Sequence, residues 1–205
     1  MDMDSENLNR NPKEEKIPVS QAITLYLHDL VCLLCGMLIV LLLVFRVVVV
    51  SGTSMNMTLL DGDYLLLLSN TFYRTPAQGD IIVVSKDSFD NGAAFVKRVI
   101  ATEGQTVDID FSAGIVYVDG VALDEPYTNT LTNVNGGMQF PLVVEDGCIF
   151  AMGDNRNISK DSRYPDIGLI DTREILGKAV FLVIPGTNDI RNPQSRDYTR
   201  IGVIE

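Results

Sequence analysis

Apolar residues form one long segment near the N-terminus and then recur in short runs along the rest of the chain. No charged residue occurs from Leu30 to Phe45, and apolar character continues back to Ile23 and forward through Val47–Val50. A helix needs roughly 20 apolar residues to cross a bilayer. The pattern therefore predicts a transmembrane signal-anchor helix over residues 22–46.

Two alternatives, a cleaved signal peptide and a buried core helix, require a shorter apolar region than this one. The apolar region of a signal peptide runs for about 7 to 15 residues, and no clear small-x-small cleavage site follows before Val47–Val50. We therefore expect the segment to stay in the mature protein as a single membrane span.

The cations that flank the segment predict its orientation. Arg10, Lys13 and Lys16 precede it, whereas no Lys or Arg follows Arg46 until Arg74. Cytoplasmic flanks carry the excess of cations, so we expect a cytoplasmic N-terminus and an extracytoplasmic remainder.

The N-terminal tail, predicted over residues 1–21, is rich in Asp, Asn, Glu and Lys and shows no apolar periodicity. Such a composition cannot bury a core, and we expect the tail to be disordered.

Beyond Ser51 the chain alternates short apolar runs with turn residues. Asp-Gly, Asn-Gly, Gly-Asp and Gly-Gly pairs separate the runs at strand spacing, so residues 47–205 are predicted to form a mostly β domain. Residues from about 106 to 145 have a hairpin of their own and are interpreted as an excursion from the main sheet. The predicted strands are Tyr64–Leu68, Asp80–Ser85, Ala94–Ala101, Thr106–Ile109, Ile115–Val118, Cys148–Met152 and Leu176–Ile184.

The charge of the chain excludes one class of partner. The formal net charge is −11, and residues 51–205 hold 12 Lys and Arg against 21 Asp and Glu. Nucleic-acid-binding domains instead carry a basic patch, so no nucleic-acid partner is expected. We interpret the acidity as a solubilising surface rather than as a binding site for a partner.

The rarity of histidine and cysteine excludes several kinds of catalytic site. His28 is the sole histidine and belongs to the membrane segment, so the outer domain cannot form a Ser-His-Asp triad or a Cys-His pair. Cys32 and Cys35 also belong to that segment and leave Cys148 alone, which excludes a disulfide framework. No cluster has zinc-ligand spacing, and we expect no metal and no cofactor.

A serine activated by a lysine is a remaining chemistry for a hydrolase. The lysine must be largely uncharged near neutral pH, and burial lowers its pKa by disfavouring the ammonium form. Strand alternation places Lys97 on one face with Phe95 and Val99. Taken alone, however, a Lys-Arg pair such as Lys97-Arg98 is more often found on an exposed strand edge.

The candidate serine is Ser54, which lies in a glycine-containing bend after the Val47–Val50 run. Such a bend can expose a hydroxyl beside main-chain N–H groups that are able to hold an oxyanion. A serine in a loop has no functional meaning by itself.

A third polar element, Gly153–Arg163, follows the apolar Ile149–Met152 run. One alternative is a loop held together by its own Asp and Asn side chains. Another is a calcium loop, but the bidentate Glu that ends its 12-residue frame is missing here.

These elements, in this order behind an N-terminal anchor, resemble the bacterial type I signal peptidase family in its compact, Gram-positive-like form. Lys97-Arg98-Val99 resembles the general-base box, and Gly153–Arg163 matches the box Gly-Asp-Asn-Arg-x-x-Ser-x-Asp-Ser-Arg throughout. Ser54-Met55 with Thr58-Leu59 resembles the nucleophile box, and Gly79–Val84 the strand after it. The resemblance implies a serine endopeptidase with an antiparallel, barrel-like catalytic domain that is shared with the SOS-response repressors.

The resemblance also implies a role for each matching residue. Ser54 would be the nucleophile, and Lys97 the general base that takes its proton. Ser159 would hydrogen-bond to the Lys97 amine and orient it. Gly52 stands where some members carry an oxyanion-binding serine, so the oxyanion would rest mainly on the Ser54 N–H. Two supporting ion pairs are implied, Asp161 with Arg163 and Asp154 with Arg98.

The implied substrates are preproteins that carry signal peptides, cut after small-x-small sites such as Ala-x-Ala. The substrate would lie extended between the strands that lead to Ser54 and Lys97, adding a strand to the sheet. The lipid bilayer and a nearby secretion translocon are the other implied partners, at the bacterial cell membrane. The residues expected to line shallow apolar pockets are Val48, Val50, Met55, Leu59, Phe95 and Val96.

Besides Gly52, two features depart from the usual family pattern. Met57 replaces the usual proline, which loosens the turn after Ser54, and the region between Lys97 and Gly153 is short, as in the smaller Gram-positive type. The lysine at position 97 matches the bacterial family and argues against the endoplasmic-reticulum relatives, which carry histidine there.

Two rival functions remain. One rival is a non-catalytic, membrane-tethered β-domain that assists secretion or pilus assembly. The other is a self-cleaving regulator related to the SOS-response repressors, which have no membrane anchor and carry a DNA-binding module.

Overall fold

The computed structural model describes residues 18–86, 89, 92–187 and 195–204. The chain forms two compact units, Met1–Leu41 and Leu42–Glu205, and the second is called the β-domain below. The disordered tail predicted over residues 1–21 lies outside the described residues as far as residue 17.

The N-terminal helix α1 runs from Val19 to Val44, so it begins and ends slightly earlier than the predicted span over residues 22–46. Pro18 lies just before the helix, and its carbonyl accepts a hydrogen bond from Gln21 N at 2.9 Å, the kind of i→i+3 contact that closes a helix end. At the other end the run of β-branched valines favours an extended backbone. Strand β1 (Phe45–Val49) therefore begins at the residue after the helix.

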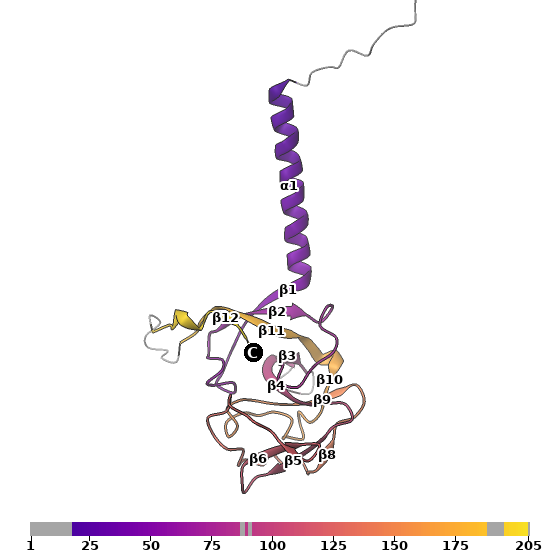
Figure 1. Ribbon diagram of the computed structural model, residues 1–205, viewed down its shortest axis with the longest axis vertical. Coiled ribbons are helices and arrows are strands. Elements are labelled where there is room, and N and C mark those ends of the chain that lie inside the picture. Colours follow the sequence, from indigo (N-terminus) through magenta and orange to yellow (C-terminus); the bar gives the residue numbers. More distant parts are fainter. Residues whose placement is uncertain (1–17, 87–88, 90–91, 188–194, 205) are drawn as a thin grey trace, which may run out of the picture. The chain divides into compact units, whose positions relative to one another are not determined.

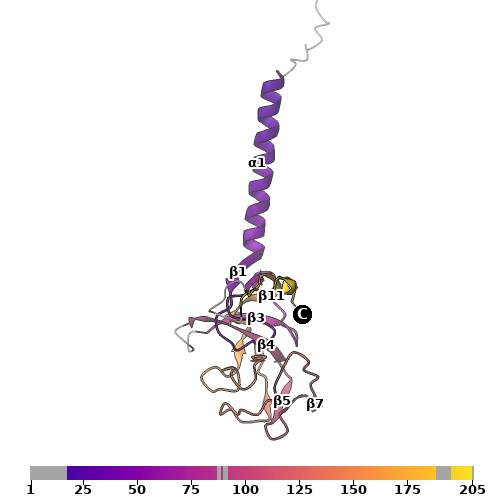
Figure 2. The same cartoon turned by 90° about the vertical axis from the view of Figure 1, so that its left-hand side faces the viewer.

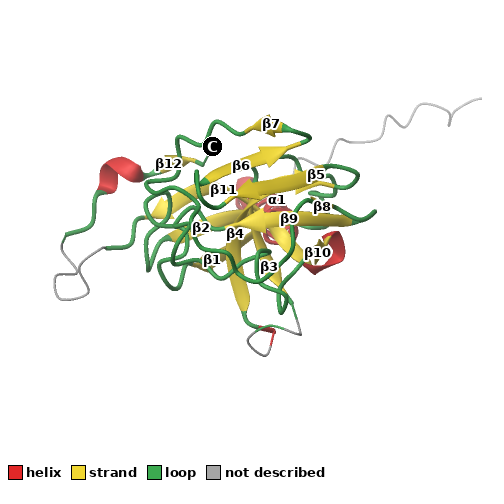
Figure 3. Cartoon of the chain, turned by 90° about the horizontal axis from the view of Figure 1, so that it is seen from below, coloured by secondary structure: helices red, strands yellow, loops and turns green. Residues whose placement is uncertain are grey.

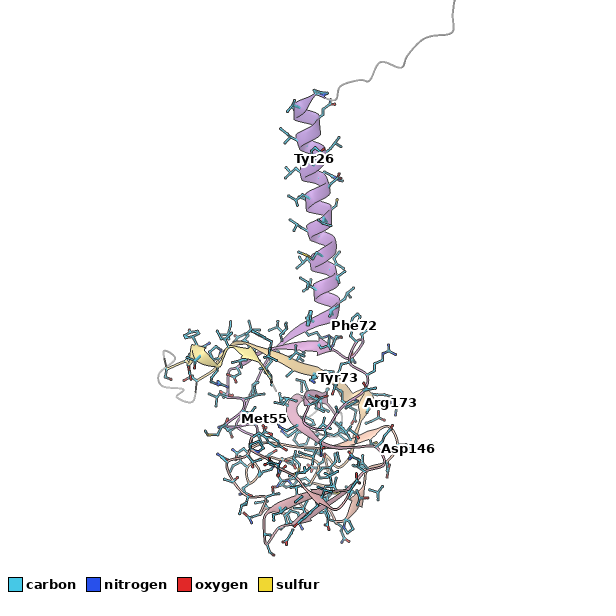
Figure 4. All side chains as sticks on the ribbon, viewed as in Figure 1. Tyr26, Met55, Phe72, Tyr73, Asp146 and Arg173 are labelled. Atoms are coloured by element: carbon cyan, nitrogen blue, oxygen red, sulfur yellow. The ribbon has the colours of Figure 1, made fainter. Side chains whose placement is uncertain are left out.

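Helix α1 is long and apolar enough to cross a membrane. It has 26 residues, nearly all of them apolar or uncharged. At 1.5 Å per residue it spans about 39 Å, more than the roughly 30 Å hydrocarbon core of a bilayer. Its side chains are exposed along its length, as Tyr26 shows with 76% of its surface accessible (Figure 4).

The main sheet of the β-domain has eight strands, and every pairing in it is antiparallel (Figure 1). The strand order is β1-β2-β11-β3-β4-β9-β10, with β12 paired to β11, so β1 and β10 end the path. Besides β1, the strands are β2 (Tyr64–Ser69), β3 (Ile81–Ser85), β4 (Ala94–Thr102), β9 (Cys148–Met152), β10 (Ile170–Asp171), β11 (Ile175–Ile184) and β12 (Gly202–Val203).

A second, four-stranded sheet has the order β7-β6-β5-β8. It falls within the predicted excursion over residues 106–145, and it lies at the end of the β-domain remote from β1 and β2 (Figures 1 and 2). Its strands are β5 (Thr106–Asp110), β6 (Ile115–Val118), β7 (Val121–Ala122) and β8 (Leu142–Val143). Two 3-10 turns, η2 (Thr172–Glu174) and η3 (Tyr198–Arg200), complete the described elements.

The predicted fold class is confirmed: the β-domain is mostly β and antiparallel, and it follows an apolar N-terminal helix. Strands occupy its interior, with loops around them (Figure 3). One buried apolar cluster joins the two sheets through β4, β9, β5 and β6. Another packs β1, β2, β3 and β11 against Met55 and Leu59, two residues of the turn after β1. The core therefore fixes the position of this turn against the main sheet.

Candidate active site

The turn that carries Ser54 is held from both sides. Met55 and Leu59 are each only 1% exposed, and Leu59 N donates to Met55 O at 2.9 Å. Gly52 has φ of +93°, a backbone conformation that favours glycine, and its N–H donates to Asp61 Oδ1 at 2.7 Å. Anchored in this way, the turn leaves the Ser54 side chain partly exposed.

Strand β4 brings Lys97 to this turn. The Lys97 Nζ atom lies 2.9 Å from Ser54 Oγ and donates to Val96 O, also at 2.9 Å. The Lys97 side chain is 3% exposed, and its amine lies 5.4 Å from the centre of the Phe95 ring. A nucleophilic hydroxyl and a buried amine are thus within hydrogen-bond reach across 43 residues of sequence.

Burial lowers the pKa of Lys97 from 10.5 to about 8. The nearby carboxylates of Asp161 and Asp154 raise the pKa, and the Arg163 guanidinium lowers it. Desolvation of the ammonium form is the largest of these effects. An amine with a pKa near 8 is partly neutral under physiological conditions and can accept a proton.

Asp154 links three elements around the pair. Its carboxylate is 0% exposed and accepts two hydrogen bonds from Arg98, Nε at 2.9 Å and Nη2 at 2.8 Å. It also accepts a 2.5 Å hydrogen bond from Thr58 Oγ1, in the turn that carries Ser54, the expected nucleophile; this turn is called the nucleophile turn below. The ion pair expected between Asp154 and Arg98 is therefore present and is bidentate.

Asp161 and Arg163 form the second expected ion pair, and both are fully buried. Arg163 Nε donates to Asp161 Oδ1 at 2.8 Å, and Nη2 donates to Oδ2 at 2.9 Å. Asp161 Oδ2 also accepts from Gly153 N at 3.0 Å. The ion pair thus holds the start of the Gly153–Arg163 segment.

The backbone at Gly153 passes against Ser54 and Ser159 with no space for a side chain. A Cβ at this position would lie 2.4 Å from Ser54 O and 2.2 Å from Ser159 Oγ. The next contact comes from Asn155, whose N–H donates to Ser54 O at 3.0 Å. Thr58 and Asn155 belong to the matched boxes, but their contacts with Asp154 and Ser54 could not be predicted, because each contact joins residues that are about 100 positions apart.

Ser159 does not make the hydrogen bond that was expected of it. Its side chain is 1% exposed, and Oγ has no hydrogen-bond partner among the described residues. The Lys97 amine donates instead to the carbonyl of Val96. The interpretation of Ser159 as the residue that orients Lys97 therefore stays a prediction, while its position against Gly153 keeps it beside the site.

A small cavity of about 60 Å³ adjoins Ser54. Met55, which lies inside the β-domain (Figure 4), forms part of its wall. Leu59 does not line the cavity and packs in the core instead. The predicted pocket residues that do line it are Val48, Val50, Met55, Phe95 and Val96.

Among the described residues, no group of three or more His, Cys, Asp and Glu side chains is arranged to hold a metal ion. The charged residues around Ser54 and Lys97 pair with one another instead.

Known proteins with similar sequences belong to one family. Residues 23–184 match the family described as signal peptidase, peptidase S26. The chain is 40% identical to a probable signal peptidase I-1 of Synechocystis sp., over 67% of this chain and 70% of the relative. It is 34% identical to signal peptidase I of Bacillus licheniformis, over 72% and 80% of the two chains.

A solved structure is also similar to the chain. It is a signal peptidase I from Enterococcus faecalis V583 and shares 32% identity, with a TM-score of 0.42, over 51% of this chain and 97% of the solved one.

Proposed function

The chain belongs to the peptidase S26 family of signal peptidases and has type I signal peptidase function, and from this premise we propose that Ser54 and Lys97 form its catalytic dyad. The observation that carries the proposal is the 2.9 Å separation of Lys97 Nζ and Ser54 Oγ, with the amine buried. Its lowered pKa, about 8, lets the amine act as a base near neutral pH.

In the first half of the reaction, neutral Lys97 accepts the proton of Ser54 Oγ as the oxygen attacks the carbonyl carbon of the scissile peptide bond. The tetrahedral intermediate carries an oxyanion, and the Ser54 N–H is the donor that we assign to it. Gly52 has no hydroxyl, and its own N–H is engaged by Asp61. Collapse of the intermediate breaks the C–N bond, and the Lys97 ammonium gives its proton to the leaving amine.

In the second half, a water molecule attacks the acyl group on Ser54. Lys97, neutral again, takes the proton of that water, and collapse of the second intermediate returns the proton to Ser54 Oγ. Asp154 and Asp161 stabilise the ammonium that forms in each half, because both raise the pKa of Lys97. The two carboxylates therefore limit how far burial lowers that pKa.

The small cavity supports specificity for small side chains next to the cleaved bond. The cavity is small, about 60 Å³, and most of its lining side chains are apolar. It therefore suits a small apolar side chain better than a long or charged one. We assign Val48, Val50, Met55, Phe95 and Val96 to this recognition, which suits cleavage after small-x-small sites.

The strand pairing supports binding of the substrate in an extended conformation. In the described pairings β4 contacts β3 from Ala94 to Arg98 but contacts β9 only from Arg98 onward. The first half of β4 thus has an open edge, and β1 is an end strand of the same sheet. Both strands line the cavity beside Ser54, so an extended peptide can add there by main-chain hydrogen bonds.

Helix α1 and its flanking charges support a single-pass topology at the bacterial cell membrane. The apolar helix fits the membrane anchoring of signal peptidases. We assign the N-terminus to the cytoplasm and the β-domain to the outer face, because Arg10, Lys13 and Lys16 precede the helix. The lipid bilayer and a nearby secretion translocon are the partners that follow from this topology.

Cleavage of a precursor by matched variants tests the dyad. A detergent-solubilised precursor with an Ala-x-Ala site is incubated with the parent protein and with folded Ser54→Ala and Lys97→Ala variants. Thr53→Ala is the control, because it removes a neighbouring hydroxyl that lies outside the pair. We expect the parent and Thr53→Ala to cut at the Ala-x-Ala site and the other two variants to be at least 1,000-fold slower, on the scale seen when members of a catalytic triad are removed.

Two results would contradict the proposal. Cleavage by folded Ser54→Ala at the rate of the parent would exclude Ser54 as the nucleophile. A folded parent that binds the precursor and leaves it uncut would favour the non-catalytic tethered domain.

A further inference from the structure

A carboxylate from the second sheet reaches the region behind the catalytic pair. Glu125 follows β7, and its side chain is 12% exposed. Both of its oxygens accept hydrogen bonds from Arg156, whose side chain is 1% exposed: Nη1 donates to Oε2 at 2.8 Å, and Nη2 donates to Oε1 at 2.5 Å. Tyr127 OH donates to Oε1 at 3.0 Å. Glu125 is therefore the anion that neutralises a buried cation of the Gly153–Arg163 segment.

Arg156 extends this contact to the backbone beside the nucleophile. Its Nε donates to Gly153 O at 3.1 Å. The position of Gly153 is closely limited, because a Cβ there would lie 2.4 Å from Ser54 O. Asn155 N donates to the same Ser54 oxygen at 3.0 Å. The residues on both sides of Asp154 thus bear directly on the main chain of Ser54.

A second series of contacts connects Glu125 to Arg98 through the ring of Tyr127. The Tyr127 ring, whose hydroxyl bonds to Glu125, lies under the Arg98 guanidinium, with 4.0 Å between Cζ and the ring centre. Arg98 holds Asp154 through two hydrogen bonds. Asp154 in turn accepts from Thr58 Oγ1 in the nucleophile turn. Cation–π stacking of this kind fixes the plane of the guanidinium as well as its position.

We propose that Glu125 is a positioning residue for the reaction: through Arg156 and Tyr127 it holds residues 153–156 and Arg98 against the nucleophile turn, and so sets the approach of Ser54 Oγ to Lys97 Nζ. Glu125 has no contact with the reacting atoms in this arrangement and acts only through these neighbours. The inference rests on the proposed dyad, since it concerns the distance between its two members.

The physical reason for a catalytic effect is the sensitivity of proton transfer to distance. A displacement of about 1 Å at a reacting group can cost on the order of 100-fold in rate. Removing one partner of a buried ion pair leaves an uncompensated charge, which forces the other partner to move toward water or toward another acceptor. Arg156 would then release Gly153 O, and the backbone behind Ser54 would shift.

Steady-state kinetics of Glu125→Gln on the full-length protein in detergent provides the test, with the Ala-x-Ala precursor as substrate. The variant keeps the shape of the side chain and loses its charge. We expect kcat to fall by at least tenfold and KM to stay within twofold of the parent, at a temperature at which both proteins are folded. Glu103→Gln is the matched control, because Glu103 accepts a hydrogen bond from Gly147 N away from the dyad; we expect its kcat to stay within twofold of the parent.

A double-mutant cycle separates positioning from a general effect on folding. If Glu125 acts largely through Arg156, replacing Glu125 in an Arg156→Gln background should lower kcat by clearly less than it does in the parent, because only the route through Tyr127 remains. Tyr127→Phe keeps the ring on Arg98 and removes a single hydrogen bond to Glu125; we expect a three- to tenfold loss of kcat with KM unchanged. This variant also tests the inference if Glu125→Gln does not fold.

Three results would overturn the inference. The first is a parental kcat in folded Glu125→Gln, and the second is a parental kcat in Tyr127→Phe. The third is a full, additive loss when Glu125 is replaced in the Arg156→Gln background. Ser54→Ala, measured beside them, reports on the dyad alone: activity retained there would contradict the proposed function, whereas an inactive Ser54→Ala with a fully active Glu125→Gln would contradict the positioning role alone.

Discussion

Lys97 shows at the scale of a single residue how catalysis and stability oppose each other. Its amine is buried and has two described hydrogen-bond partners, Ser54 Oγ and Val96 O. Asp161 and Asp154 favour its charged form, but burial outweighs them and lowers the pKa to about 8. A lysine in this environment is a useful base and an unfavourable core residue.

The first prediction concerns the pH dependence of cleavage. The active form of the free enzyme carries neutral Lys97, so kcat/KM should rise with pH through a midpoint near 8, the pKa of that amine. Below the midpoint the rise should be close to tenfold per pH unit, and above it the profile should level off. Initial rates at low precursor concentration between pH 6 and pH 9.5 provide the measurement. A profile that falls across this range would rule out Lys97 as the base.

The second prediction concerns the stability of Lys97→Met. The folded pKa of about 8 lies below the ordinary value of 10.5, so between these values the unfolded chain binds more protons and the free energy of unfolding rises with pH. At pH 7 the folded parent carries the full cost, on the order of 3 kcal/mol. After allowance for the two lost hydrogen bonds, we expect inactive Lys97→Met to be more stable than the parent by up to about 2 kcal/mol at pH 7.

Urea unfolding in detergent at pH 7 and at pH 10.5 measures this difference. The advantage of Lys97→Met should shrink at the higher pH, where the parent amine is neutral in the folded chain and only half protonated in the unfolded chain. Lys160→Met is the control, because Lys160 is about half exposed and pairs with Asp166 on the surface; its stability should change by no more than about 0.5 kcal/mol. A Lys97→Met protein that is less stable than the parent at pH 7 would contradict the cost assigned to burial.

At the scale of elements, the nucleophile turn and the Gly153–Arg163 segment form one assembly. The turn packs against the core of the β-domain through its own residues Met55 and Leu59. From the other side, Thr58 Oγ1 bonds to Asp154 and Ser54 O accepts from Asn155 N. Neither element reaches this geometry alone, because each supplies donors whose acceptors lie on the other.

The third prediction addresses the contact between these two elements. Gly153→Ala would place a Cβ 2.4 Å from Ser54 O and 2.2 Å from Ser159 Oγ, so one of the two segments must move. We expect cleavage to fall by at least 100-fold, on the scale of a displacement of about 1 Å, and stability by about 1 to 3 kcal/mol.

Gly202→Ala provides the matched control for this prediction, because nothing lies within 4 Å of a Cβ added there. Cleavage rates and urea midpoints of both variants make the comparison. Normal activity in Gly153→Ala would contradict the close approach of Gly153 to Ser54 O.

Strand periodicity and turn pairs were sufficient to predict most of the elements. The predicted run Tyr64–Leu68 corresponds to β2, and Ile115–Val118 is β6 to the residue. The two-residue strands β7, β8, β10 and β12 were missed, because two residues are too few to show a period. The predicted hairpin within residues 106–145 is part of a four-stranded sheet. The other two strands of this sheet, β7 and β8, have two residues each and could not be recognised from their period.

The contacts within the site were harder to predict than its members. Ser54 and Lys97 could be singled out by elimination and by resemblance, and the Gly153–Arg163 match named Asp154 and Arg98. The partners of Arg156 could not be inferred, because any of several Glu side chains could reach a buried Arg and the choice of Glu125 depends on how the second sheet packs. The missing hydrogen bond of Ser159 likewise depends on side-chain geometry that no pattern encodes.

At the scale of the whole molecule, the helix and the β-domain have different proposed roles, membrane anchoring and catalysis. Residues 19–44 form a helix that can span a bilayer, and the β-domain holds both members of the proposed dyad. Strand β1 begins one residue after the helix ends.

The fourth prediction concerns the orientation of the chain in the membrane. External protease added to spheroplasts should digest the β-domain and leave an N-terminal epitope tag protected, because Arg10, Lys13 and Lys16 favour a cytoplasmic tail. A variant with these three residues changed to Gln and two Lys residues inserted after Arg46 should invert a substantial share of the molecules. The assignment would be wrong if the tag of the parent were digested while the β-domain survived.

The covalent intermediate offers the most direct test of the dyad. An ester analogue of the precursor, which acylates faster than it deacylates, is quenched in acid during turnover, and the protein is cleaved with trypsin and analysed by mass spectrometry. The proposed mechanism predicts the acyl group on Ser54, within the fragment between Arg46 and Arg74, and its absence from Ser54→Ala and Lys97→Ala. An acyl group on any other residue, or turnover of the ester by Ser54→Ala without one, would contradict the assignment of Ser54 and Lys97 as the catalytic pair.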